Sequence, residues 1–76
     1  MKDVIGILNE IRPGRDFSGA EDFFAQGVLD SLDLTALVAA LENRYNLFVD
    51  VEEFVPEKFR NLAAIKSLLA KHGVIL

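Results

Sequence analysis

One apolar pattern in the middle of the chain restricts the possible folds more than any other feature. Between residues 31 and 45, apolar or aromatic side chains recur at spacings of three and four residues: Leu34, Leu37, Val38, Leu41 and Tyr45. This spacing places all of them on one face of an α-helix, because a helix turns once every ~3.6 residues. Such a helix is stable only if other segments cover its apolar face.

Two further segments show helical spacing and can provide that cover. The first lies near the N-terminus, ends at Pro13, and carries on its apolar face Val4, Ile5, Leu8 and Ile11. The second begins with Asn61 as its cap and directs inward Leu62, Ile65, Leu68 and Leu69. Pro56 can start a shorter helix of about one turn, through Phe59. We therefore predict an all-α fold for residues 1–76, a single domain built as a small helical bundle of three main helices plus one short helix.

The segment that joins the first two predicted helices is too apolar for a free loop. Residues 13–30 show no extended periodicity, but they contain large apolar side chains that we expect to pack on the core: Phe17, Phe23, Phe24, Val28 and Leu29. Ser18 and Glu21 are spaced as in a capping box, which predicts one helical turn over residues 19–24.

The connector after the central helix has a different pattern. Leu47, Val49 and Val51 fall at every second position, which is the period of a β-strand. The chain contains no second candidate strand that could pair with this one. We therefore expect an extended connector whose apolar side chains are buried, followed by Phe54 as a further core residue.

The composition excludes several classes of protein and of site. Because the chain has no cysteine, it can form no disulfide, thiolate nucleophile or cysteine-ligated zinc site. The formal net charge of -4 argues against nucleic-acid binding, and no apolar run approaches the ~20 residues of a membrane span. No metal site is expected, since Asp30, Asp33 and Glu42 do not fit a calcium loop, which needs glycine where Thr35 stands. We expect a monomer in the reducing cytoplasm.

The start of the central helix holds the most informative polar residues, in the stretch Gly27-Val-Leu-Asp-Ser-Leu32. Asp30 can cap the helix and Asp33 can complete a capping box, so Ser31 is not needed for capping. The apolar residues take the inner face, which leaves the Ser31 hydroxyl exposed beside unpaired backbone N–H groups at the positive end of the helix dipole. That is a favourable place for a phosphate group. Capping alone is the commoner reason for an Asp-Ser pair at a helix start.

The arrangement of these elements resembles an acyl carrier protein over nearly the whole chain. The match runs from Asp30-Ser31-Leu32 through Leu41-Glu42 and Tyr45 to the closing helix at Asn61-Leu62. The resemblance implies that a phosphopantetheinyl transferase attaches 4′-phosphopantetheine from coenzyme A covalently to Ser31. The thiol of that arm would hold an acyl or aminoacyl group as a thioester, supplied by a loading ligase and passed to a downstream transferase or synthase. The carrier itself would not be an enzyme.

Several positions resemble one branch of that family more than another. Ala36 and Phe48 stand where fatty-acid carriers commonly have acidic residues. The spacing from Glu52 to Asn61 is also longer than in the fatty-acid type. It is similar to that of carriers for D-alanyl or other aminoacyl groups, or of specialised pathways. The sequence leaves the choice between these cargoes open.

A partner-binding surface is expected beside Ser31. Leu32, Ala36 and Ala39 lie opposite the buried face of the predicted helix, with Asp30 next to the modified residue and Asp33 at the margin. This surface is nearly uncharged, so partner enzymes should dock through close apolar contact more than through charge.

Three other kinds of protein are possible from the sequence, and they fit it to different degrees. The main alternative is a helical protein–protein interaction module that is never modified, in which Ser31 is only a helix-start residue. A small DNA-binding domain fits less well, because the basic residues are few and scattered. An autonomous enzyme fits less well too, because no cluster of catalytic side chains is apparent.

Overall fold

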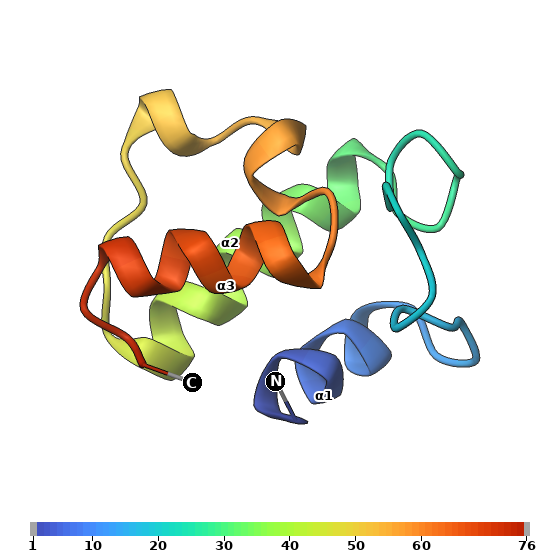
Figure 1. Ribbon diagram of the computed structural model, residues 1–76, viewed down its shortest axis with the longest axis horizontal. Helices are drawn as coiled ribbons and strands as arrows, with labels where there is room; N and C mark the ends of the chain where they lie inside the picture. The colour runs from blue at the N-terminus through green and yellow to red at the C-terminus, as the bar shows by residue number, and fades with distance from the viewer. Residues whose placement is uncertain (1, 76) are drawn as a thin grey trace.

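The computed structural model describes residues 2–75, which form α1 (Lys2–Ile11), α2 (Ser31–Tyr45), η1 (Val51–Glu53), η2 (Pro56–Phe59) and α3 (Leu62–Lys71). The two η elements are short 3₁₀ helices. Figure 1 shows α3 drawn in front of α2, with α1 below them and the loop from α1 to α2 at the right. The predicted all-α fold and its three main helices are confirmed, and η1 is an additional short element. No helix within residues 2–75 is long and apolar enough to cross a membrane.

The predicted inner face of α2 forms the centre of the core. Its buried apolar side chains are at most 4 % exposed: Leu34, Leu37, Val38 and Leu41. α1 and η2 pack against α2, and α3 packs against η2. These elements add to the same core cluster Val4, Leu8, Phe59, Ile65, Leu68 and Leu69. Leu62 is half-buried and packs against this core, whereas Ile5, for which a core position is expected, is half-buried but is not among the residues packed against it.

α1 and α2 run antiparallel, and an ion pair joins them at each end. At the start of α1, the Asp3 carboxylate lies 2.8 Å from Nη2 of Arg44, near the end of α2. At the other end, Arg12, just after α1, contacts Asp30 and Asp33 at the start of α2. The contact at the α2 start is part of the candidate site described below.

The loop before α2 is held by aromatic packing, as predicted, but its backbone differs from the prediction. The Phe17 and Phe23 rings meet edge to face, 5.5 Å apart, and both are buried. The expected helical turn over residues 19–24 does not form. The Ser18 hydroxyl donates to the Asp16 carboxylate (2.8 Å) instead of capping a helix. Asp22 fixes the local turn, because its carboxylate accepts hydrogen bonds from the backbone N–H groups of the two residues at 24 and 25, both at 3.0 Å.

Two contacts tie this loop to the C-terminal part of the chain. The backbone N–H of Phe23 donates to the carbonyl of Arg60 (2.6 Å). The Asn61 side-chain amide donates to the carbonyl of Glu21 (2.9 Å), while its oxygen caps α3 by accepting from Ala64. Asn61 therefore confirms its predicted role as the α3 cap and also fixes the position of the loop.

The connector after α2 follows the prediction only in part. Val49 is buried, and its N–H donates to the Glu42 carboxylate (2.9 Å). Val51, for which burial is expected, is 89 % exposed. The reason is that the Asp50 N–H donates to Glu53 (3.1 Å) and a 3₁₀ turn begins, so the two-residue alternation of a strand ends there. Phe54 is likewise 40 % exposed and not a core residue.

Candidate functional site

The start of α2 is fixed by a complete capping box. The Asp30 carboxylate accepts a hydrogen bond from the backbone N–H of Asp33, and the Asp33 carboxylate accepts one from the backbone N–H of Asp30, both at 3.0 Å. This arrangement satisfies two backbone donors without using Ser31. The predicted cap is confirmed, and α2 begins at Ser31 itself.

Ser31 is exposed in the first turn of α2. Within residues 2–75, its hydroxyl makes no hydrogen bond, and neither do the backbone N–H groups of Ser31 and Leu32. These two donors lie at the end of the helix where the dipole is positive. A phosphate on the Ser31 oxygen would find both a positive potential and free N–H donors close by. The geometry thus provides an accessible nucleophilic oxygen at a place that favours an anion.

Asp33 is buried at the start of α2. The prediction that it lies at the margin of the exposed partner-binding surface is therefore wrong. Asp33 is only 7 % exposed. Its carboxylate accepts a hydrogen bond from Nε of Arg12 at 2.8 Å. Burial raises the pKa of Asp33, but hydrogen bonds from Arg12 and from the Asp30 backbone, with the charge of Arg12, lower that pKa below its usual value overall. Asp33 is therefore an ionised structural residue that orders the helix start.

Sequence reasoning did not identify Arg12. Its Nη2 also lies 3.2 Å from the Asp30 carboxylate, so one guanidinium contacts both acids of the capping box. The signal in the sequence is weak: a single arginine follows the first helix and stands just before Pro13. Its partners lie 18 and 21 residues further along the chain, and only the antiparallel pairing of α1 and α2 brings them together.

The outer face of α2 is as expected from the helical spacing. Leu32 is 81 % exposed, and Ala36 and Ala39 are exposed further along the same helix. Leu32, Ala36 and Ala39 are called the outer strip below.

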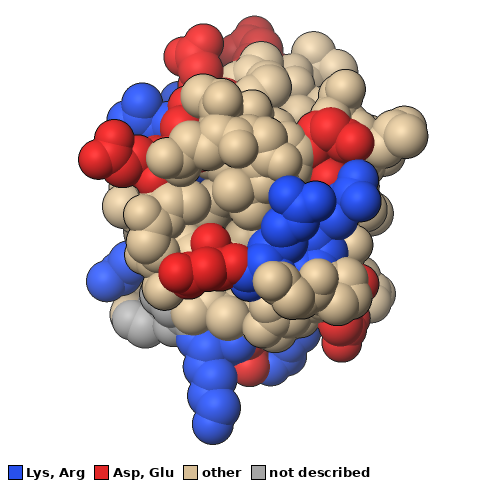
Figure 2. Space-filling model, turned by 90° about the vertical axis from the view of Figure 1, so that its right-hand side faces the viewer, with Lys and Arg blue, Asp and Glu red and all other residues tan. Residues whose placement is uncertain are grey.

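Figure 2 views the molecule from the side of the loop before α2, and there acidic and basic side chains are interspersed with uncharged surface. That face carries no large region of one charge.

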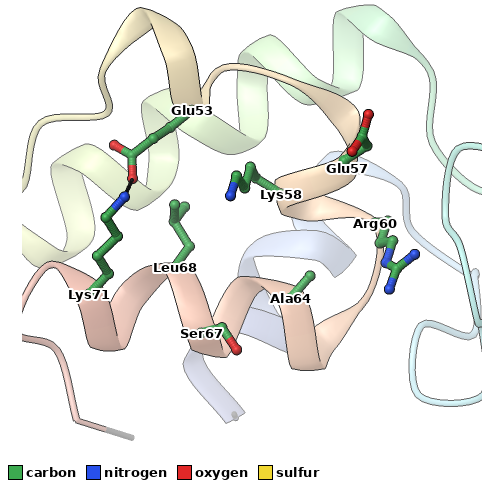
Figure 3. Close-up of a pocket in the computed structure, with 8 residues that line it drawn as sticks. All are labelled: Glu53, Glu57, Lys58, Arg60, Ala64, Ser67, Leu68 and Lys71. Carbon is green, nitrogen blue, oxygen red and sulfur yellow. Dashed lines mark ion pairs between the residues drawn. The ribbon is translucent and has the colours of Figure 1, made fainter.

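A separate hollow of about 440 Å³ lies between η2, η1 and α3. Figure 3 shows Lys58 extending into it and Lys71 directed towards Glu53. Glu53 is buried, and its carboxylate accepts from His72 Nε2 (3.0 Å) and pairs with Lys71 (3.7 Å). The pKa of Glu53 is lowered below its usual value, first by the hydrogen bond from the Asp50 backbone. Burial raises this pKa, whereas His72 and Lys71 lower it further. This cluster fastens η1 to the end of α3. Ser31 does not line the hollow, so the candidate site is a surface position.

Comparisons with known proteins agree with this geometry. A family model described as "Phosphopantetheine attachment site" matches residues 1–69. The chain belongs to the acyl carrier protein family. A carrier of this family bears a covalently attached 4′-phosphopantetheine and delivers the group bound to that arm to partner enzymes such as ligases and transferases.

Curated relatives of this carrier share one description. A D-alanyl carrier protein of Leuconostoc citreum is 34 % identical, with 90 % of this chain and 94 % of the relative covered. A D-alanyl carrier protein of Leuconostoc mesenteroides is 32 % identical over the same shares. One from Streptococcus gordonii is 43 % identical, with 68 % of this chain and 67 % of the relative covered. No solved structure matches the chain significantly.

Proposed function

We propose that Ser31 is the residue to which 4′-phosphopantetheine is attached, and that the carrier holds an aminoacyl group, with D-alanyl as the first candidate. One observation carries the assignment of the site: Ser31 is the first residue of α2, its hydroxyl is exposed, and Asp30 already provides the cap. The other two serines lack this setting. Ser18 is bonded to Asp16 in the loop, and Ser67 lies beyond the first turn of α3.

The residues around Ser31 fit an attached phosphate. The Ser31 oxygen would form a phosphodiester as the diphosphate bond of coenzyme A breaks and adenosine 3′,5′-bisphosphate leaves. The free N–H groups of Ser31 and Leu32 would then face the new anion. When bound, the arm supplies a thiol, which this cysteine-free chain lacks. The capping box and Arg12 hold the helix start in place while partner enzymes approach.

The cargo and the partners form the finer part of the proposal. The relatives named D-alanyl carrier proteins support an aminoacyl cargo. A phosphopantetheinyl transferase would modify the chain, an aminoacyl-activating ligase would load it, and a downstream transferase or synthase would accept the group. The chain would do no chemistry beyond presenting the arm, because Ser31 lies exposed on the surface at the start of α2. We propose that these reactions take place in the cytoplasm, where coenzyme A is available to the phosphopantetheinyl transferase.

Intact-mass analysis tests the attachment. The purified apo-carrier is incubated with coenzyme A, Mg²⁺ and a broad-specificity phosphopantetheinyl transferase. We expect complete conversion to a species heavier by one phosphopantetheine, and peptide fragmentation should locate it on Ser31. The holo-carrier is then offered D-alanine, L-alanine and acetyl donors with the matching ligases. A chain that stays unmodified would support the alternative of an unmodified interaction module.

The outer strip yields a prediction about docking. A charged side chain within the outer strip would have to be desolvated against an uncharged partner surface. We therefore expect Leu32→Glu and Ala36→Glu to lower kcat/KM for loading by the aminoacyl-activating ligase by about tenfold, which corresponds to ~1.4 kcal/mol. The loading rate of the wild type should change little with salt, because close apolar contacts are not screened.

Ala70→Glu provides the matched control for this docking test. Ala70 is also exposed, but it lies in α3, away from the outer strip. This variant should load at the wild-type rate, and circular dichroism should show that all three variants keep their helices. If the wild-type rate falls steeply with salt while the two strip variants load normally, charge guides docking and the outer strip is only a helix surface.

A further inference from the structure

The Asn61 side chain serves two parts of the fold at once. Its oxygen caps α3 by accepting from the backbone N–H of Ala64 (2.8 Å), and its amide nitrogen donates to the carbonyl of Glu21 (2.9 Å). A serine or an aspartate could provide the same cap, so α3 does not need the nitrogen. The bond to Glu21 therefore acts on the loop before α2.

The turn between η2 and α3 is connected to the start of α2 by a series of hydrogen bonds through this loop (Figure 1). The backbone N–H of Phe23 donates to the Arg60 carbonyl (2.6 Å). The Phe23 carbonyl in turn accepts from the backbone N–H groups of Val28 (2.8 Å) and Leu29 (2.9 Å). Leu29 is buried and directly precedes the α2 cap, Asp30. The series thus ends two residues before Ser31.

The other side-chain hydrogen bonds of residues 13–29 stay inside the loop. The Gln26 side-chain oxygen accepts from the backbone N–H groups of Glu21 (3.1 Å) and Asp22 (3.3 Å), and Arg15 donates to the Gly27 carbonyl (3.2 Å). These bonds shape the loop without joining it to another element. Within residues 2–75, the bond from Asn61 is the one side-chain hydrogen bond that ties residues 13–29 to the rest of the fold.

We propose that Asn61 is a positioning residue for phosphopantetheine attachment, which holds the loop before α2 in place for the modifying enzyme. This inference rests on the proposed attachment at Ser31. An enzyme that reaches Ser31 must also approach the residues that directly precede α2. A loop that is loose in the free carrier has to be ordered when the enzyme binds, which costs conformational entropy. Loss of the tie should therefore raise KM and leave kcat largely unchanged.

Two substitutions of Asn61 keep the cap and remove the donor. Asn61→Ser and Asn61→Asp both retain an oxygen that can accept from the Ala64 N–H. Neither supplies a donor to the Glu21 carbonyl, because the serine side chain is shorter and an ionised aspartate has no N–H. Ala63→Asp is the control for charge. Ala63 is exposed in the first turn of α3, so this variant adds a negative charge without removing either bond of Asn61.

Ile65→Val is the control for stability. Ile65 is fully buried in α3, and removing one methylene from it should destabilise the fold about as much as losing one hydrogen bond. The substitution leaves the loop and its ties unchanged. A role of Asn61 in global stability alone would make this variant behave like the two position-61 variants.

The first measurement is the rate of attachment by a broad-specificity phosphopantetheinyl transferase with coenzyme A, at varied concentrations of apo-carrier. We expect Asn61→Ser and Asn61→Asp to raise KM for the carrier about fivefold, which corresponds to ~1 kcal/mol, and to keep kcat within about twofold of the wild type. Ala63→Asp and Ile65→Val should match the wild type in both constants. Circular dichroism should show wild-type helix content in all four variants.

Amide hydrogen exchange then locates the effect. In Asn61→Ser, the backbone N–H groups of Phe23, Val28 and Leu29 should exchange about fivefold faster than in the wild type, because the loop opens more often. In Ile65→Val they should exchange at the wild-type rate, because local opening of the loop does not break the core contacts of that side chain.

Three results would overturn the inference. The first is a wild-type KM in both position-61 variants. The second is an equal rise of KM in Ile65→Val, which would show that lost stability causes the effect. The third is a rise in Asn61→Asp and Ala63→Asp but not in Asn61→Ser, which would assign it to charge.

In each of these cases the wild type would still be labelled on Ser31, so the proposed attachment would stand. Failure of the wild type to accept phosphopantetheine on Ser31 would instead remove the proposed function and the role of Asn61 with it.

Discussion

Replacing Ser31 with alanine should abolish phosphopantetheine attachment completely and leave the helices intact. The Ser31 oxygen is the atom that would form the phosphodiester, and alanine offers none. The fold should tolerate the change because Asp30 and Asp33 make the cap, and the serine hydroxyl makes no hydrogen bond within residues 2–75. Alanine is also a better helix former than serine by a few tenths of a kcal/mol. Intact mass after treatment with transferase and coenzyme A measures attachment, and thermal unfolding measures the fold.

Ser67→Ala is the matched control for this substitution. Ser67 is likewise an exposed serine in a helix, but it lies in the body of α3. This variant should accept phosphopantetheine fully. Attachment that persists in Ser31→Ala, or that disappears in Ser67→Ala, would place the modified residue elsewhere and refute the assignment of Ser31.

Replacing Leu41 with alanine should nearly unfold the protein. Leu41 is fully buried, at 0 % exposed, in the centre of the α2 inner face. Truncating a buried leucine removes its transfer free energy and leaves a cavity, which together cost ~2–5 kcal/mol. A domain of this size has only a few kcal/mol of stability to lose. Denaturant unfolding followed by circular dichroism should show a large fall in the free energy of unfolding.

Leu32→Ala provides the comparison within the same helix. Leu32 is 81 % exposed, so the same change of side chain should alter the free energy of unfolding by less than about 0.5 kcal/mol. The two leucines thus differ in burial and not in chemistry or in the helix that carries them. Similar stability losses in both variants would contradict the orientation of α2.

The parts of the fold that sequence could predict are those fixed by short-range patterns. The spacing of Leu34, Leu37, Val38 and Leu41 defines the inner face of α2, and Asp30 and Asn61 are caps whose function depends on residues three positions away. The exposure of Ser31 follows from the same spacing. Helix capping and periodicity act within one or two turns, so their effects are visible in a single sequence.

The parts that could not be predicted depend on which elements meet in space. Arg12 and Asp33 are 21 residues apart, and Glu53 and His72 are 19 apart. No local pattern joins such pairs. Val51 shows a different limit, because its alternation with neighbours is consistent with a strand while the contact between Asp50 and Glu53 favours a 3₁₀ turn. Two local signals compete there, and the hydrogen bond between Asp50 and Glu53 determines that the backbone forms a 3₁₀ turn and not a strand.

The ties between the loop and residues 60 and 61 have a consequence for biosynthesis. Phe23 donates to the Arg60 carbonyl, and Asn61 donates to the Glu21 carbonyl, across 40 positions of sequence in the second case. A ribosome that has released only the residues up to the end of α2 therefore displays Ser31 directly after a loop whose fastening residues have not yet been translated. The modifying enzyme would meet the finished site only after the start of α3 has emerged. Attachment of the arm should accordingly follow synthesis of residues 60 and 61 and not precede it.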